Sequence, residues 1–200
     1  MMTKMNNKEI RTLTSPIEIR AKEEEEGKHY IVGYALKFNK FSENLGGFIE
    51  KIEPTALDNT DFSDVRALFN HDPSHVLGRT KAGTLKLDID DFGLRYEITL
   101  PDTTFARDLI NSMERGDIDN SSFGFSVDTE NGDEWKYDDE KSVYVRTIKN
   151  INFLPEISIV TFPAYSQTES LVAQRSLEHY KHELDKAIKQ KQIEIELELY

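Results

Sequence analysis

The sequence predicts an α+β fold that is mainly β, and three features of the chain carry this prediction. Short segments in which apolar and polar residues alternate recur between residues 17 and 162. One stretch among them, 103–115, has the spacing of an amphipathic helix. A charged stretch at 171–192, free of glycine and proline, predicts a second helix. With 200 residues and no cysteine, the chain can bury a core without disulfide bonds.

The body of the chain is predicted to be a series of short strands separated by turns. The clearest pair is the hairpin of 84–89 with 94–100, because apolar residues alternate on both sides of the turn. The predicted strands, rich in β-branched and aromatic residues, are 17–21, 29–38, 48–52, 65–69, 84–89, 94–100, 143–148, 151–153 and 156–162.

Two charged stretches between these strands are expected to be loops. Residues 22–28 include four consecutive glutamates and predict a solvated turn. Residues 129–141 form an acidic excursion around the only tryptophan, Trp135, and predict a hairpin tip or flexible loop. Pro155 and Pro163 are expected to bound the last strand, since proline cannot donate to a sheet ladder.

Capping residues indicate where the two helices begin and end. Thr103 or Thr104 can cap the first helix, and Gly116 can stop it. The second helix is expected to be an arm rather than part of the core. Residues 193–200 alternate strictly, so an added strand and a frayed helix both remain open. The apolar residues of the second helix lie three or four apart, at Leu177, Tyr180, Leu184 and Ile188.

The composition excludes several classes of protein. The chain has 37 acidic and 25 basic residues, a net charge of -12 and a pI of about 4.9, which disfavours duplex nucleic acid as a partner. No apolar run approaches the roughly 20 residues of a membrane span, and the N-terminus lacks the apolar core of a signal peptide. We therefore expect a soluble intracellular protein that binds neither nucleic acid nor a membrane.

Two adjacent serines, Ser121 and Ser122, stand at the start of an apolar alternating segment that Gly124 interrupts. A hydroxyl on a strand, close to a residue without a Cβ atom, allows a substrate carbonyl to approach the backbone. Such a serine could be an acyl-transfer nucleophile, although a loop end followed by a β-bulge explains the same pattern. The catalytic interpretation requires a base elsewhere in the chain.

His71 follows the strand 65–69, and Glu156 stands at the start of the strand 156–162. Neutral imidazole can take the proton of a serine hydroxyl, and a third group must orient the ring and stabilise the imidazolium. Glu156 could be that group, with Asp72 as a local substitute. Loop histidines and strand-end carboxylates are also common without catalysis, so the residues alone permit a Ser-His-carboxylate set without requiring it.

His71, Asp72 and His75 could also suggest a metal site. Pro73 works against a continuous helix that would bring them together, and no third clustered ligand is evident nearby. The absence of cysteine removes the thiolate zinc sites. We expect neither a metal nor another cofactor.

Three motifs in order resemble those of the phage prohead (capsid maturation) proteases of the HK97 type. The resemblance covers roughly residues 10–168, and three motifs at suitable separations are more specific than any one of them. These motifs are LFNHD at 68–72 with VLGRT at 76–80, SFGF at 122–125, and EISIVTFPAY at 156–165.

The resemblance implies a serine endopeptidase with a fold similar to that of the herpesvirus assemblins, a β-barrel core surrounded by helices. It implies that His71 is the general base, Ser122 the nucleophile and Glu156 the third member. Ser122 directly precedes Phe-Gly-Phe as in the family motif, and Ser121 is the fallback nucleophile. Herpesvirus enzymes have a second histidine in the third position, so Glu156 departs from that branch.

The resemblance also implies how the chain is organised and what it acts on. We expect a prohead protease domain over 9–168 and a C-terminal helical arm over 169–200, which is a targeting or processed segment. The expected substrates are the major capsid protein precursor with its scaffold segment, and the protease itself. The expected location is the inside of the procapsid in the host cytoplasm, and a homo-oligomer is compatible with these expectations.

Two other classes of protein are alternatives to a protease. The main alternative is a noncatalytic head-assembly or scaffolding protein that keeps the fold without using the site. A serine esterase of the α/β-hydrolase type fits poorly, because the chain lacks a Gly-x-Ser-x-Gly elbow. Its chain order is also serine, acid, histidine, whereas the order here is histidine, serine, acid.

Overall fold

Strands are the most abundant secondary structure in the part of the chain that the structure describes, as the sequence predicts. The structure is a computed structural model and describes residues 8–13, 17–21, 29–128, 131–162 and 171–198, so the expected turn at 22–28 lies outside the described residues. The strands are β1 (Glu9–Leu13), β2 (Glu18–Ala21), β3 (His29–Lys37), β4 (Phe48–Ile52), β5 (Arg66–Phe69), β6 (Asp72–Arg79), β7 (Leu85–Ile89), β8 (Gly93–Thr99), β9 (Asn120–Val127), β10 (Asp133–Asp138), β11 (Val143–Ile148) and β12 (Ile151–Val160). The helices are α1 (Thr104–Glu114), α2 (Leu171–Glu198) and two short 3-10 helices, η1 (Pro54–Leu57) and η2 (Thr80–Ala82).

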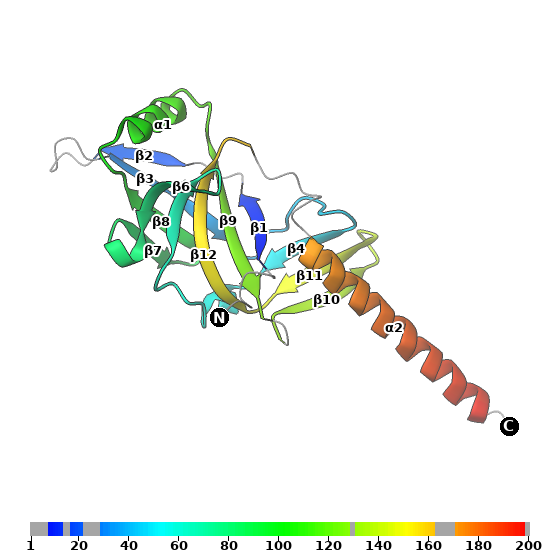
Figure 1. Cartoon of the computed structure of the whole chain (residues 1–200). Coiled ribbons are helices and arrows are strands. Elements are labelled where there is room, and N and C mark those ends of the chain that lie inside the picture. The colour runs from blue at the N-terminus through cyan, green and yellow to red at the C-terminus, as the bar shows by residue number, and fades with distance from the viewer. Residues whose placement is uncertain (1–7, 14–16, 22–28, 129–130, 163–170, 199–200) are drawn as a thin grey trace.

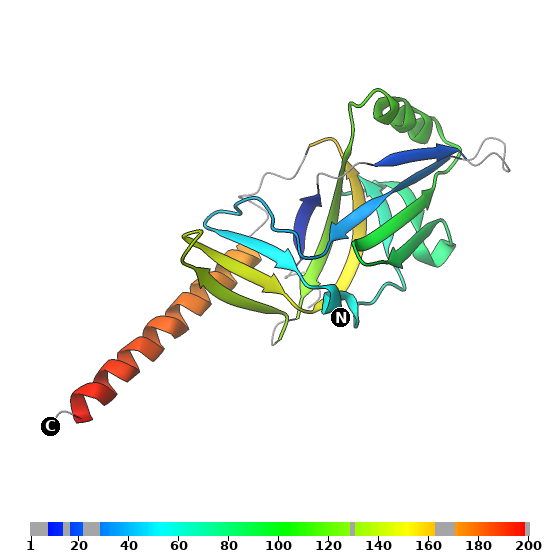
Figure 2. The ribbon, with the colours of Figure 1, turned by 180° about the vertical axis from the view of Figure 1, so that it is seen from behind.

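The described strands form three sheets. A five-stranded sheet with the order β1-β9-β12-β5-β6 lies in the middle of the molecule (Figures 1 and 2). The four-stranded sheet β2-β3-β8-β7 lies on one side of it and the three-stranded sheet β10-β11-β4 on the other. The mainly β, α+β fold is therefore confirmed, although none of these sheets closes on itself into a barrel within the described residues.

The main hydrophobic core gathers the inward side chains of the four- and five-stranded sheets and one face of α1. Ile31, Leu94, Phe125 and Leu154 are all fully buried in it. Burying a side chain of this size contributes about 1.5–3 kcal/mol. The predicted hairpin is present as β7 and β8, which pair antiparallel.

Helix α1 begins and ends where its capping residues predict. The Thr103 side chain accepts a hydrogen bond from the Ala106 amide, which satisfies one free amide of the first turn. Gly116 has a φ of 79°, a left-handed conformation that glycine adopts without strain and that ends the helix. The buried face of α1 is formed by Ala106, Leu109, Ile110 and Met113.

Two predictions about strands were wrong. The acidic stretch 129–141 contains the strand β10, which pairs antiparallel with β11 and packs Trp135 edge-on against Phe48 at 5.1 Å between ring centres. Pro155 does not begin the last strand but lies inside β12, at a register irregularity between Phe153 and Glu156. A strand tolerates proline at such an irregularity, because no ladder hydrogen bond is lost there.

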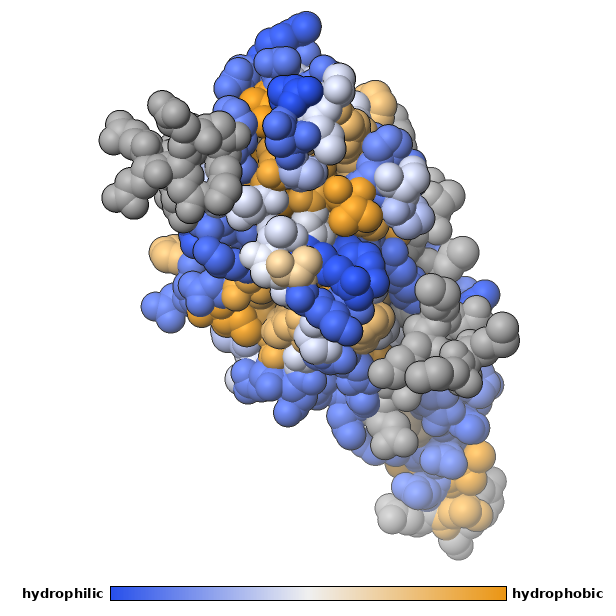
Figure 3. Space-filling view, turned by 60° about the vertical axis from the view of Figure 1, so that its left-hand side comes forward, coloured by the Kyte–Doolittle hydropathy of each residue, from blue (hydrophilic) through white to orange (hydrophobic). Residues whose placement is uncertain are grey.

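Helix α2 is longer than predicted and extends away from the body (Figure 1). It includes residues 193–198, so the open choice between strand and helix is decided for the helix. Its first turns pack Ala173 and Leu177 against Phe48 and Trp135. Beyond this contact the helix is exposed, and apolar residues lie near its far end (Figure 3). No helix in the described ranges is long and apolar enough to cross a membrane.

Candidate active site

His71 lies in a two-residue turn between β5 and β6. Asn70 and His71 have φ values of 49° and 59°, and two consecutive left-handed residues are what a tight hairpin of this twist requires. Asn70 fixes the turn to the end of β12, because its side chain accepts a hydrogen bond from the Thr161 amide at 2.9 Å and donates to the Thr161 hydroxyl at 3.2 Å. The imidazole is therefore placed by backbone geometry over β12.

Glu156 lies directly within reach of that imidazole. Its Oε1 atom is 2.8 Å from His71 Nδ1 and 2.9 Å from Lys8 Nζ, and its Oε2 atom accepts a hydrogen bond from the Ser158 hydroxyl at 2.7 Å. Burial favours the neutral acid, but the hydrogen bond and charge of His71, the charge of Lys8 and the Ser158 hydroxyl outweigh it and lower the pKa of Glu156 from 4.5 to about 2. The group is thus an ionised acceptor at neutral pH. Glu156 lies inside β12, not at the start of a strand as predicted.

The two serines of β9 point to opposite sides of the sheet, because successive strand residues alternate. Ser121 points into the core, where its Oγ atom lies 2.6 Å from the Tyr96 hydroxyl. Burial raises the pKa of Tyr96, so this pair is a buried neutral hydrogen bond. Ser122 is opposite Ser158 on the neighbouring strand β12, on the same face as Glu156. The alternation therefore distinguishes the two serines and favours Ser122 as the partner of His71.

Gly124 leaves the space that Glu156 occupies. In the antiparallel pairing of β9 with β12, Gly124 is directly opposite Glu156. A Cβ atom on Gly124 would lie 2.7 Å from Glu156 Oε1 and closer still to Lys8 Cε, and real Cβ atoms essentially never approach this closely. The Ser-Phe-Gly spacing therefore puts a hydroxyl and an empty position side by side on one face.

The Ser122 hydroxyl makes no hydrogen bond to His71 in this structure. Its Oγ atom donates to the carbonyl oxygen of Arg11 at 3.0 Å, and Ser122 is 0% exposed. The Nε2 atom of His71 is buried and has no hydrogen-bond partner within the described part of the chain. His71 and Glu156 are therefore directly joined, while Ser122 shares their face without a hydrogen bond to them.

Asp72, the other candidate for the third position, is directed elsewhere. Its carboxylate accepts hydrogen bonds from the Ser74 hydroxyl and amide and lies 2.9 Å from His75 Nδ1. The hydrogen bonds from Ser74, followed by the one from His75, lower the pKa of Asp72 to about 2. Asp72 therefore stabilises the start of β6 and does not orient the His71 ring.

No group of three or more histidine, cysteine, aspartate or glutamate side chains is placed to hold a metal in the described ranges. His71 and His75 each face a different carboxylate, Glu156 and Asp72. The contact between His71 and Glu156 supports proton transfer through an imidazole that a carboxylate orients.

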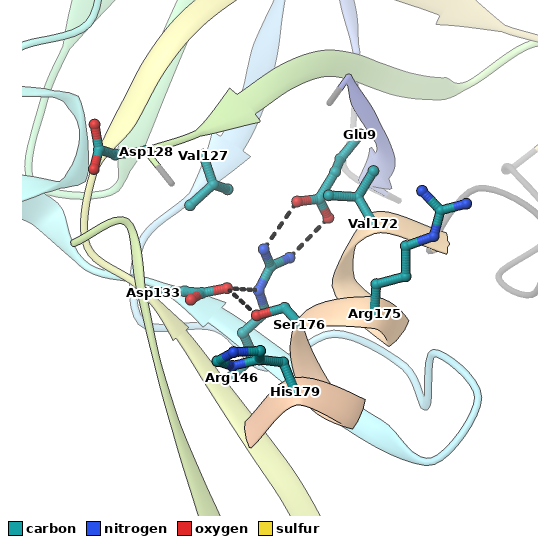
Figure 4. A pocket seen from close by; sticks show the side chains of 9 residues that line it. All are labelled: Glu9, Val127, Asp128, Asp133, Arg146, Val172, Arg175, Ser176 and His179. Carbon is teal, nitrogen blue, oxygen red and sulfur yellow. Dashed lines mark hydrogen bonds and ion pairs between the residues drawn. The ribbon is translucent and has the colours of Figure 1, made fainter. Parts of the chain in front are cut away.

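A second polar cluster lies in a pocket where α2 meets the body (Figure 4). Arg146 is buried there and donates to Glu9, Glu50 and Asp133 at 2.6–3.2 Å. Arg11 is also buried and donates to Glu9 and Glu50. Despite the cost of burial, these carboxylates raise the pKa of Arg146, and the arginines lower the pKa of Glu50. Because every charge in the cluster has an opposite partner, we assign it a structural role.

Sequence reasoning missed three participants of the site: Lys8, Ser158 and the Arg11 carbonyl. Ser158 was accessible in principle, because residues two apart on a strand share a face and Glu156 was already a candidate. Arg11 belongs to β1, a strand that was not predicted, and Lys8 directly precedes it. The buried side of β1 carries charged residues, which no apolar periodicity reveals.

Comparison with known proteins gives a family and a fold. Residues 15–183 match the model of the caudovirus prohead serine protease family. The structure of the bacteriophage T4 capsid assembly protease gp21 superimposes with a TM-score of 0.52 at 12% sequence identity. That match covers 78% of this chain and 98% of the T4 chain, and at this identity it shows the fold alone. No curated protein sequence matches the chain.

Proposed function

The chain belongs to the caudovirus prohead serine protease family, and on this basis we propose that it is an endopeptidase that uses Ser122, His71 and Glu156. One observation carries the proposal: His71 Nδ1 lies 2.8 Å from Glu156 Oε1, on the face of the sheet that also holds Ser122. An imidazole oriented through Nδ1 has its Nε2 atom free to act as a base. The Nε2 atom of His71, which none of the described residues contacts by a hydrogen bond, fits this role.

In the proposed reaction, Ser122 Oγ attacks the carbonyl carbon of the scissile peptide bond while His71 Nε2 takes its proton. The imidazolium then gives this proton to the nitrogen of the leaving amine, and the peptide bond breaks. Water, activated by the same nitrogen, hydrolyses the acyl-enzyme and regenerates the serine. Glu156 keeps its negative charge throughout, since its pKa is about 2, and accepts the Nδ1 proton as a hydrogen bond.

We propose capsid precursor proteins as the substrates, namely the major capsid protein precursor, its scaffold segment and the protease itself. The family supports this assignment, and the T4 neighbour is described as a capsid assembly protease. The proposed place of action is the inside of the procapsid in the host cell. The protease domain is proposed to span 9–168, with 169–200 as an arm that targets the enzyme or is processed.

Co-expression with the capsid precursor of the same phage tests this function. The wild-type chain is expected to trim the precursor, and His71→Ala is expected to leave it uncut, because a base and its nucleophile act as a unit. His75→Ala is the matched control, since that histidine contacts Asp72 and Phe105 and not the proposed catalytic residues. Equal trimming by wild type and His71→Ala would remove the proposed base. A folded wild-type chain that enters proheads and cuts nothing would instead support the noncatalytic head-assembly alternative.

A further inference from the structure

The N-terminal strand β1 touches the proposed catalytic residues directly. It is the edge strand of the five-stranded sheet and pairs antiparallel with β9, with Ile10 opposite Gly124. Its two sides differ in surroundings. Glu9 and Arg11 point their side chains into the buried charge cluster, whereas the preceding Lys8 points toward Glu156.

Two contacts from this end of the chain involve the catalytic set. The Arg11 carbonyl accepts the hydrogen bond of the Ser122 hydroxyl at 3.0 Å, so the proton that His71 would take is directed toward β1. Lys8 Nζ lies 2.9 Å from Glu156 Oε1, the same oxygen atom that is 2.8 Å from His71 Nδ1. His71 thus shares its orienting oxygen with an ammonium group and lacks a partner on Nε2 among the described residues.

The buried charge cluster holds β1 in this position. Arg11 Nε lies 2.5 Å from Glu50 Oε1 on β4, and Arg146 on β11 donates to both carboxylate oxygens of Glu9 at 2.7 and 2.9 Å. Both anchoring strands belong to the three-stranded sheet, outside the proposed active site. The strand β1, which contacts the proposed catalytic residues, is therefore anchored to a separate part of the fold.

We propose that Lys8 and the main chain of Arg11 restrain the catalytic residues, and that the enzyme gains reactivity when this end of the chain releases them. This inference rests on the proposed function of Ser122, His71 and Glu156. Lys8 acts through Glu156 and is a positioning residue.

The restraint has two physical components. A serine hydroxyl that donates to a carbonyl must rotate before it can donate to His71. The Lys8 ammonium and a protonated His71 would lie within about 6 Å of each other through their shared oxygen, a distance at which like charges disfavour each other. Besides these groups, Ser158 on β12 contacts Glu156, and Arg66 is opposite Glu156 on β5, where its guanidinium pairs with Asp64 at 3.5 Å.

A fluorophosphonate probe measures serine reactivity in the full-length chain without a peptide substrate. We expect Lys8→Met to label at Ser122 about two- to fivefold faster than wild type, the range expected for loss of one partly exposed ion pair. Lys8→Arg keeps the charge and is expected to label at the wild-type rate. The low-pH end of the labelling profile should move to higher pH in Lys8→Met, because the imidazolium no longer faces the ammonium. A merely structural role for Lys8 would not shift this profile.

The outcomes separate this inference from the proposed function. Labelling of Lys8→Met at the wild-type rate or slower, with an unshifted pH profile and an unchanged melting temperature, would overturn the restraint. If wild type cuts the capsid precursor in a Ser122-dependent manner in the same preparation, the proposed function stands without it. If no folded variant labels at Ser122 and Ser122→Ala still cuts the precursor, the nucleophile assignment and the restraint both fail.

Discussion

A Cβ atom on Gly124 would lie 2.7 Å from Oε1 of Glu156 on the neighbouring strand β12. The carboxylate of Glu156 therefore occupies the space that a side chain at Gly124 would fill. Glu156 is held there by His71 on one oxygen and Ser158 on the other. The glycine two residues after Ser122 is therefore required by the side chain across the ladder and not by a special backbone conformation. The serine motif and Glu156 depend on each other through this contact.

Gly124→Ala is expected to displace Glu156 from His71. The added methyl group also meets Lys8, but that side chain is flexible and can move, whereas Glu156 is buried. We expect precursor cleavage to fall about 10- to 100-fold, because a misplaced orienting group costs this much in catalytic sites. Steady-state cleavage assays measure the effect, and Ser126→Ala on the same strand is the control. Wild-type cleavage by a folded Gly124→Ala chain would show that Glu156 does not need its position.

Glu156→Gln is expected to change how stability depends on pH. Folding lowers the pKa of this carboxyl from 4.5 to about 2, so its contribution is fully present above pH 4.5 and is lost as the pH falls toward 2. The wild-type free energy of unfolding should fall by about 2–3 kcal/mol more than that of Glu156→Gln over this range. Urea unfolding at several pH values measures both curves. Parallel curves would mean that Glu156 has no charged partner in solution.

Arg146→Met is expected to be strongly destabilising. The substitution leaves Glu9 and Asp133 without their main cationic partner in a buried site, which costs about 3–5 kcal/mol. Lys136→Met, on the exposed side of the neighbouring strand β10, is expected to change stability by less than about 0.5 kcal/mol. Chemical denaturation of the two variants tests this difference. Equal stabilities would show that the cluster contributes nothing to holding β1.

A chain that ends at Lys181 tests the role of the protruding helix. This truncation keeps Ala173 and Leu177 on Phe48 and Trp135, so the free energy of unfolding should stay within about 1 kcal/mol of the full chain. We expect the shortened protein to label normally with the fluorophosphonate probe but to enter proheads poorly, since it lacks the exposed part of α2. Packaging equal to that of the full chain would remove the targeting role of this segment.

The sequence alone predicted the elements and residues whose signals are local. Alternation revealed the hairpin of β7 and β8, capping residues revealed α1, and the motifs around His71 and Ser122 marked the site that we propose. Glu156 was predicted as a candidate but placed at a strand start, because Pro155 hid the continuity of β12. These signals require no knowledge of which strands lie side by side.

Features that depend on long-range pairing could not be predicted. The strand β1 escaped notice because the charged residues Glu9 and Arg11 occupy its buried positions. The strand β10 escaped notice because Trp135 is its one buried position, and the charged residues around it are typical of a loop. The contact of Ser121 with Tyr96 distinguishes Ser121 from Ser122, and this contact joins strands that are far apart in the sequence. Lys8 and Glu156 are far apart in the sequence, so no local pattern predicts the contact between them.

The identity of the nucleophile is the central claim, and two single substitutions test it most directly. Ser121→Ala leaves the Tyr96 hydroxyl buried without its serine partner, so it should lower the free energy of unfolding by about 1–3 kcal/mol and preserve cleavage. Ser122→Ala should keep the fold and abolish cleavage of the capsid precursor. The measurement is the extent of precursor cleavage by each folded variant when co-expressed with its substrate. Loss of cleavage in Ser122→Ala alone is the predicted result; loss in Ser121→Ala alone, or full cleavage by both, would contradict the account.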